Sequence, residues 1–263
     1  MEFFKSVWHN RRMLGNLIKH DFKNRYLGNH LGIIWAFIQP VVMISIYWFV
    51  FTYGLKAGKI DNSVPFLVWL MAGLIPWFFI SDAIMSCSSA ITSQSFLVKK
   101  IVFNVKLLPV VKIGSALIVS IIFWLLLVIC LLVYGYYPDL NWVGVIYFLG
   151  CAVALILSLG LLLSSITVFM PDVGQMVSIF IQVMFWATPI FWNKDMLHGK
   201  LQLIILFNPF AYIVDGIRDS VIYDIPFCGH YKNGLFFWVF TIVLFIIGNR
   251  VFNKLRPHFA DVL

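Results

Sequence analysis

The chain has 263 residues, of which 62% are hydrophobic and 17% aromatic, whereas only 11% are charged, against roughly 25% in an average soluble domain. Its mean hydropathy is +0.94, and a soluble protein of this size would expose much of that apolar surface as aggregation-prone patches. Soluble enzymes, secreted disulfide scaffolds and disordered proteins are therefore excluded. The composition predicts an all-α polytopic membrane protein.

The first 30 residues precede the first long apolar run and carry an amphipathic pattern. Between residues 3 and 26, aromatic and aliphatic side chains recur at helical spacing, and the opposite side is polar and basic. The pattern predicts an interfacial amphipathic helix over 1–30, lying in the plane of the lipid head groups. A membrane-surface anchor is the simpler interpretation. Alternatively, its basic face also meets a partner subunit or a phosphate-bearing lipid, in which case Lys19, Lys23 and Arg25 can pair with the phosphate.

Six apolar runs follow, and about 20 apolar residues suffice to cross the hydrocarbon core. Pro40, Pro76 and Pro189 fall inside them and are interpreted as kinks, because neighbouring helices can satisfy the backbone groups that a proline frees. The sequence therefore predicts six transmembrane helices, of which the fifth is the shortest. The runs cover 33–54, 65–92, 108–134, 142–169, 175–192 and 235–252.

The net charge of +8 is distributed around these runs. With both termini in the cytoplasm, 13 Lys and Arg residues fall in inside segments and 6 in outside loops, as the positive-inside rule requires. We therefore expect both termini to be cytoplasmic. Because the basic residues flank apolar runs, where they meet anionic membrane lipids, nucleic acid is not an expected partner.

The segment SQSFLVKKIVFNVKLLP begins at Ser93 and joins the second and third runs. It is amphipathic and basic, and it is too short and too charged to cross the membrane. It is either a positive-inside loop or a short helix that docks onto a cytosolic protein.

The segment 193–234 between the last two runs contains a helix signal. Asn208 followed by Pro209 is a helix N-cap with proline at the first helical position. A helix of about 14 residues spans about 21 Å, so we expect it to be re-entrant or interfacial in the outer leaflet, near an exit path. The alternative is a surface helix in which Asp215 and Arg218 form an ordinary i,i+3 ion pair; Arg218 is also a candidate contact for a lipid phosphate. The expected apolar face consists of Phe210, Ile213, Val214, Ile217 and Val221, with Asp215, Arg218 and Asp219 opposite.

Aromatic residues crowd the first, second and fifth runs. Most of them fit interfacial belts and lipid-facing positions. Several lie well inside the runs, however, and the flat faces of sugars stack on aromatic rings, so an aromatic-lined passage for a glycan is the alternative. The candidate channel-lining residues are Trp35, Tyr47, Trp77, Phe185 and Trp186.

Motifs of catalysis and of nucleotide or metal binding are absent from the sequence. There is no GxxxxGK[ST], HExxH or GxSxG motif, the six histidines are scattered, and the four cysteines show neither CxxC nor metal spacing. No catalytic residue, metal site or cofactor is therefore expected in this chain. Asp82 is the only carboxylate deep within a run, and a water-facing or hydrogen-bonded residue in a pore wall is a better interpretation than a proton relay. Energy then most simply comes from another polypeptide.

Five strings, in this order, resemble the permease subunits of polysaccharide-exporting ABC transporters. One departure is Met170-Pro171-Asp172, where that family usually has an aromatic-Arg-Asp turn. The strings are DFKNRYLGNHLGIIWAFIQPVV (21–42), GLIPWFF (73–79), VFMPDVGQMV…FWATPIFW (168–192), FNPFAYIVDGIRD (207–219) and FNKLRPHFADVL (252–263).

The resemblance implies a single transmembrane permease domain over 1–263, which forms a homodimer on two copies of a separate ABC ATPase subunit. That subunit would bind ATP and Mg²⁺. The segment 93–107 would be the cytoplasmic coupling helix, and 193–234 would form a gate at the outer mouth. The coupling residues would be Phe96, Leu97, Lys99, Lys100 and Phe103.

The resemblance also implies the cargo and the location. The expected cargo is a lipid-linked polysaccharide of the O-antigen type, carried on undecaprenyl pyrophosphate and exported across a bacterial cytoplasmic (inner) membrane. Wall teichoic acid, capsule, and a drug or small solute remain alternatives. A flippase or membrane enzyme that works without ATP is the remaining rival, and it would need acidic or histidine clusters that this sequence lacks.

Overall fold

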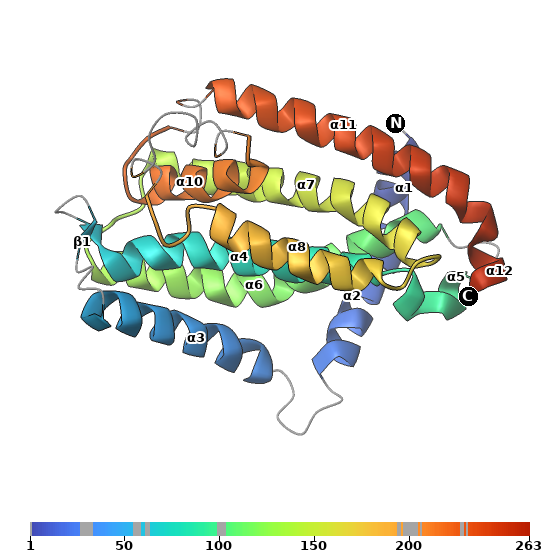
Figure 1. Ribbon diagram of the computed structural model, residues 1–263, viewed down its shortest axis with the longest axis horizontal. Helices are drawn as coiled ribbons and strands as arrows, with labels where there is room; N and C mark the ends of the chain where they lie inside the picture. The colour runs from blue at the N-terminus through green and yellow to red at the C-terminus, as the bar shows by residue number, and fades with distance from the viewer. Residues whose placement is uncertain are drawn as a thin grey trace.

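The computed structural model describes residues 2–26, 34–54, 59–60, 64–98, 104–193, 196, 205, 207–226, 229 and 231–263. Over these ranges the chain is a bundle of α-helices with one two-stranded hairpin (Figure 1). Five helical segments in the described ranges are long and apolar enough to cross a membrane. The prediction of an all-α polytopic membrane protein is confirmed.

The helices and strands have the following bounds, in chain order. They are α1 (Glu2–His9), α2 (Arg11–Tyr26), α3 (Ile34–Phe49) with a π-helical extension (Val50–Gly54), β1 (Lys59–Ile60), β2 (Val64–Pro65), α4 (Phe66–Ser88), α5 (Ser95–Val98), α6 (Leu108–Val133), α7 (Val143–Thr167), α8 (Val173–Ala187), α10 (Pro209–Val221), α11 (Tyr231–Leu255) and α12 (Phe259–Val262).

The fifth predicted span differs from the other five. Its helix, α8, has 15 residues and is about 22 Å long, whereas the hydrocarbon core is about 30 Å thick. The interpretation of Pro189 as a kink inside a helix is wrong, because α8 ends at Ala187 and Pro189 lies in the irregular stretch 188–193. Pro40 and Pro76 do lie inside α3 and α4. A total of six crossings stays a prediction.

The long helices lie side by side, and the short elements gather at the two ends of the bundle (Figure 1). The β1–β2 hairpin and α10 are at one end, and α5 and α12 are at the other. The hairpin pairs Lys59 with Pro65 and Ile60 with Val64 in antiparallel register. Which end faces the cytoplasm stays a prediction.

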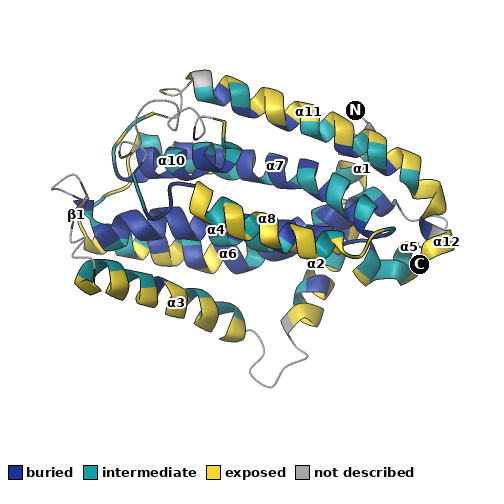
Figure 2. Ribbon diagram, viewed as in Figure 1, coloured by how far each residue is buried: buried dark blue, intermediate teal, exposed yellow. Residues whose placement is uncertain are grey.

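Helix α4 is the centre of the bundle. Within its most apolar window 78% of the residues are buried, against 6% for the span that begins with α3, because α4 contacts α3, α6, α7, α8 and α10. Figure 2 shows the contrast between buried α4 and the exposed outer faces of α3 and α11. The outer helices therefore expose apolar side chains, as is typical of helices that face lipid, and α4 is surrounded by the other helices.

Helix α7 packs closely against α11 and α10 at two positions where the neighbouring helix carries a glycine. A Cβ built on Gly248 of α11 would lie 2.9 Å from the backbone oxygen of Ser158 on α7. A Cβ on Gly216 of α10 would overlap the ring of Phe148 on α7, and that ring is fully buried. Small residues let helix backbones pack closely where lipid supplies little hydrophobic driving force.

Gly216→Ala is expected to destabilise the chain by about 1–3 kcal/mol, because the added methyl group must displace either the Phe148 ring or α10. Gly150→Ala on α7 is the matched control, since a Cβ at Gly150 meets nothing within 4 Å. That change should be neutral or stabilise the helix by up to about 1 kcal/mol. Thermal unfolding of the detergent-purified variants measures the difference, and equal midpoints for the two variants would contradict this packing.

The N-terminal amphipathic segment forms two helices, α1 and α2, with a break at Asn10. Helix α2 packs against α6: Leu14 is buried with Leu107 and Val111, and a Cβ on Gly114 would overlap Ile18. The apolar side of α2 is thus covered by protein over part of its length, and its basic side remains exposed.

Candidate functional site

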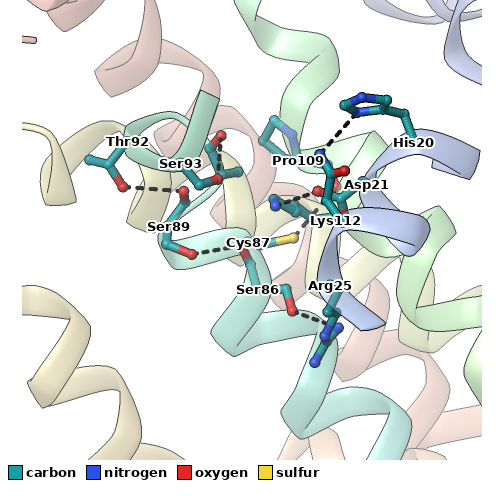
Figure 3. A network of polar contacts seen from close by, with 12 residues as sticks. His20, Asp21, Arg25, Ser86, Cys87, Ser89, Thr92, Ser93, Pro109 and Lys112 are labelled. Atoms are coloured by element: carbon teal, nitrogen blue, oxygen red, sulfur yellow. Dashed lines mark hydrogen bonds and ion pairs between the residues drawn. The ribbon is translucent and has the colours of Figure 1, made fainter. Parts of the chain in front are cut away.

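Two charged residues on α2 connect it to the interior helices. Asp21 and Arg25 are one helical turn apart and so project from the same face. The Arg25 guanidinium donates from both terminal nitrogens to the Asp82 carboxylate on α4, with Nη1 to Oδ2 at 2.9 Å. It also donates to Ser86 Oγ at 3.2 Å. Lys112 Nζ on α6 lies 2.6 Å from Asp21 Oδ1, and Figure 3 shows the Asp21–Lys112 and Arg25–Ser86 contacts together.

The two ion pairs differ in exposure, and this decides which of them can open. The side chains of Arg25 and Asp82 are 33% and 32% exposed, and such an exposed pair contributes roughly 0–1 kcal/mol. The side chains of Lys112 and Asp21 are only 13% and 8% exposed, and removing one partner of a buried pair costs about 3–5 kcal/mol. The Asp21–Lys112 pair therefore holds α2 in place, whereas the Arg25–Asp82 pair can be broken at low cost.

Two cavities meet at Arg25, Asp82 and Met85, which line both of them. The first cavity, of about 440 Å³, lies between α3, α4 and α6 and has mainly apolar and aromatic walls, including Trp35. The second, of about 460 Å³, is polar. Its further lining residues are Asp21, Asn24, Ser86, Ser89, Ser93, Gln94 and Lys112.

The sequence predicted part of this site. Arg25 was expected to be a phosphate contact together with Lys19 and Lys23, and the structure places the latter two on the exposed side of α2. Asp82 was expected to be hydrogen-bonded or water-facing, and it is both paired and part of a cavity wall. Its pairing with Arg25 was missed because 57 positions separate the two residues, and no local spacing signals such a contact.

The predicted helix after Asn208 is present as α10, and its cap has the expected form. The Asn208 side-chain oxygen accepts hydrogen bonds from the backbone N–H groups of Phe210 at 2.9 Å and Ala211 at 3.4 Å. The five residues of the predicted apolar face are all buried. Helix α10 packs on α4 and α7, so protein surrounds most of it.

The expectation for Arg218 as a lipid-phosphate contact does not fit its surroundings. Its side chain is only 3% exposed. Nε donates to the carbonyl oxygen of Trp69 at 3.2 Å, Nη2 donates to that of Ile190 at 2.8 Å, and Nη1 donates to that of Pro189. The guanidinium carbon also lies 3.5 Å from the Trp69 ring centroid. The three carbonyl groups occupy the N–H donors of Arg218 that would otherwise bind a phosphate. Arg218 instead joins α10 to α4 and to the stretch after α8.

Of the alternative interpretation of Arg218, the ion pair is confirmed, but the surface position of the helix is wrong, because most of α10 is buried. The i,i+3 pair with Asp215 is present, with Nη1 3.7 Å from Oδ1. Asp219, which was expected opposite the apolar face with Arg218, is buried as well. The sequence pattern missed this burial because the accepting carbonyls belong to α4 and to the stretch after α8, which lie 28 to 149 positions away.

Four of the five candidate channel aromatics belong to one cluster. Phe185 lies 6.2 Å from Tyr47, 5.8 Å from Trp77 and 5.5 Å from Trp186, measured between ring centroids. Trp77 is only 4% exposed, whereas Trp186 is 57% exposed. Trp35 lies apart from this cluster, in the wall of the apolar cavity. Within this chain, therefore, Trp77 faces neighbouring side chains, and Trp35 and Trp186 offer accessible rings.

The predicted coupling segment is described in part. After α4 the chain forms a 3₁₀ turn, Thr92–Gln94, and then the short helix α5, in which Phe96 is exposed and Leu97 is half-buried. Lys99, Lys100 and Phe103 lie outside the described residues.

No group of three or more His, Cys, Asp or Glu residues in the described ranges is arranged to hold a metal ion. Cys87, Cys130 and Cys151 are free thiols. The residues around Arg25 and Asp82 form cavities and ion pairs, and Trp35 and Trp186 expose their rings. These are features of a site that binds a ligand or lets it pass.

Comparison with known proteins identifies the family of the chain. Residues 13–222 match the model of the family described as ABC-2 type transporter. This chain belongs to that family. An O-antigen export system permease protein RfbA from Klebsiella pneumoniae is 31% identical over 245 residues, which are 92% of each chain. A protein of the same name from Myxococcus xanthus is 23% identical over 98% of this chain and 97% of its own length. The polysialic acid transport protein KpsM of Escherichia coli is 23% identical over 90% and 91%.

As an ABC-2 type transporter protein with several apolar helices of membrane-spanning length, the chain is a multi-pass membrane protein and a transport subunit. Both the apolar and the polar cavity lie within the residues that the family model covers.

Proposed function

We propose that this chain is the membrane-spanning subunit of an ATP-driven exporter of a polysaccharide. The observation that carries the proposal is the similarity, over about nine tenths of both chains, to proteins named as O-antigen export permeases and as a polysialic acid transport protein. The helical bundle, with its buried central α4 and its apolar outer faces, is consistent with a passage through the membrane.

The force for transport comes from a second polypeptide in this proposal. The sequence has no GxxxxGK[ST] loop, the motif that cradles nucleotide phosphates. Two copies of the chain assemble with two copies of an ABC ATPase subunit, and that subunit binds ATP and Mg²⁺. The chain itself catalyses no reaction.

The proposed cargo is a lipid-linked glycan of the O-antigen type, carried on undecaprenyl pyrophosphate. A polar cavity beside an apolar one suits such a molecule, because one part is charged and the other is hydrocarbon. Lys19, Lys23 and Arg25 attract the phosphate to α2, since basic side chains bind phosphate through charge-assisted hydrogen bonds. Export of a capsule-type polymer is the second candidate, favoured by the similarity to the polysialic acid transport protein; wall teichoic acid is the remaining variant.

The proposal also assigns an orientation. The protein lies in a bacterial cytoplasmic (inner) membrane with both termini in the cytoplasm. The end of the bundle that carries α5 and α12 then meets the ATPase, and the segment 193–234, including α10, forms a gate at the outer mouth. Accessible aromatic rings such as Trp35 and Trp186 provide stacking surfaces along the route.

Reversing the charge of the coupling segment is expected to weaken the complex. The double variant Lys99→Glu, Lys100→Glu turns two cations of the coupling segment into anions. Co-purification of the tagged ATPase with the permease should then fall about tenfold or more, because like charges at an interface cost several kcal/mol. The matched control is Lys59→Glu, Lys232→Glu, which makes the same charge change in β1 and in the first turn of α11, at the opposite end of the bundle. Undiminished co-purification would show that 93–107 is a loop that only sets topology.

The proposed function itself is tested by ATP-dependent movement of a lipid-linked glycan across liposomes that contain the chain and its ATPase. Movement of a lipid-linked glycan supports the proposal. Movement of a small solute or drug in its place would assign the chain to another kind of exporter.

A further inference from the structure

The two cavities together have the chemistry of an amphiphile, a molecule with a charged head and an apolar chain. The apolar cavity is lined by aromatic side chains from α3, α4 and α6, among them Trp35, Phe79 and Phe123. The polar cavity is lined by hydroxyl, amide and charged side chains, of which Figure 3 shows Asp21, Arg25 and Lys112 with the nearby serines. The two share Arg25 and Asp82 as lining residues, so an ion pair lies at the boundary where the head of such a molecule would join its chain.

Arg25 presents at this boundary the geometry that a phosphate requires. Its guanidinium donates from Nη1 and Nη2 to the two oxygens of the Asp82 carboxylate, and a phosphate accepts the same planar pair of donors. The hydroxyl of Ser86, 3.2 Å from Nη1, adds a further hydrogen-bonding group. The Asp82 carboxylate therefore occupies the position that a bound phosphate would take.

Lys112 is the other cation of the polar cavity, and its environment differs. It is bonded to Asp21 at 2.6 Å, and both of these side chains are largely buried. Arg25 and Asp82 are each about one third exposed. Of the two pairs that line the polar cavity, the Arg25–Asp82 pair is therefore the one that an incoming anion can open.

We propose that Arg25 binds the phosphate of an amphiphile whose apolar chain lies in the cavity between α3, α4 and α6, and that Asp82 is the resting partner that this phosphate displaces. Asp82 thus keeps Arg25 occupied when no cargo is present and lowers the affinity of the site. The inference rests on the proposed function for the identity of the cargo, a lipid-linked glycan phosphate. The chemistry of the site is shared by ordinary phospholipids.

Binding to the detergent-purified full-length chain tests the proposal, with native mass spectrometry as the readout. The probes are undecaprenyl phosphate, neutral undecaprenol, phosphatidylglycerol and inorganic phosphate. Arg25→Gln should weaken binding of undecaprenyl phosphate at least about tenfold, because charge-assisted hydrogen bonds are lost. Arg25→Lys, which keeps the charge without the planar donor pair, should fall between Arg25→Gln and the parent chain.

Asp82→Asn gives the decisive result, since it should strengthen binding about two- to fivefold by removing the competing anion. The double variant Arg25→Gln, Asp82→Asn should bind as weakly as Arg25→Gln alone. Arg12→Gln and Asp261→Asn are matched controls, because these exposed residues lie outside both cavities, and they should leave affinity unchanged. Thermal unfolding midpoints of all variants report whether each one is folded.

Three results separate the possibilities. If Asp82→Asn weakens binding as Arg25→Gln does while remaining folded, the pair only supports the structure and the inference is overturned. The inference would also be overturned if undecaprenol bound as tightly as undecaprenyl phosphate and if Arg25→Gln left both affinities unchanged. If phosphatidylglycerol and undecaprenyl phosphate bind with equal affinity, and both affinities depend on Arg25, the result would support the binding site but would contradict a glycan-linked cargo in the proposed function. Inorganic phosphate should not compete, because it has no apolar chain to place in the first cavity.

Discussion

Arg218→Gln is expected to destabilise the folded chain by about 3–5 kcal/mol, which corresponds to a midpoint about 10 °C lower. The buried guanidinium of Arg218 donates to the carbonyls of Trp69, Pro189 and Ile190. A glutamine has one amide group and cannot reach all three, so buried carbonyls lose their partners, at about 1–3 kcal/mol each. The Trp69 ring also loses the cation that stacks on it, an interaction that is strong when desolvated.

The measurement is thermal unfolding of the detergent-purified chain, monitored by circular dichroism. Arg256→Gln is the control, since Arg256 is exposed in the turn before α12 and its loss should shift the midpoint little. Arg218→Lys should be intermediate, because an ammonium group satisfies fewer of the carbonyls. Equal midpoints for Arg218→Gln and Arg256→Gln would show that this network contributes nothing to the attachment of α10.

Lys112→Met is expected to cost about 3–5 kcal/mol, because it leaves the Asp21 carboxylate buried without its partner. The same pair should be replaceable: Asp21→Leu combined with Lys112→Met removes both charges and should recover most of the loss, since an apolar pair of similar volume avoids the desolvation of two ions. The two side chains are 2.6 Å apart and largely buried, so their effects are coupled.

A double-mutant cycle of unfolding midpoints measures this coupling, and limited proteolysis shows whether α2 has separated from α6. The single variant Lys112→Met should be cut faster in the α2 region than the double variant. If the losses of Asp21→Leu and Lys112→Met simply add, the pair is not a coupled anchor for α2.

The parts of the fold that follow from local pattern were predictable from the sequence. Asn208-Pro209 identified the start of α10 because a cap depends only on the next few residues. Long apolar runs identified five helices of membrane-spanning length because the thickness of a bilayer sets that length. The strings that resemble polysaccharide-exporter permeases led to the correct family.

The parts that depend on contacts distant in the sequence were not predictable. Arg25 pairs with Asp82 on α4, 57 positions away, and Arg218 donates to Trp69 on α4, 149 positions away, and to the irregular stretch after α8. Arg218 on an amphipathic helix has the pattern of a surface residue, and only the approach of α4 and of the stretch at Pro189 explains its burial. The end of α8 at Ala187 was missed for a different reason, because the apolar composition continues beyond the helix.

The central claim is that this chain conducts a polysaccharide and that a separate ATPase drives the movement. The direct measurement reconstitutes the full-length chain in liposomes, with and without its ATPase subunit, and follows a fluorescently labelled lipid-linked glycan from one leaflet to the other. Transport and ATP hydrolysis should both require the ATPase subunit, and transport should also require ATP. Glycolipid movement or robust ATP hydrolysis by the chain alone would contradict the account.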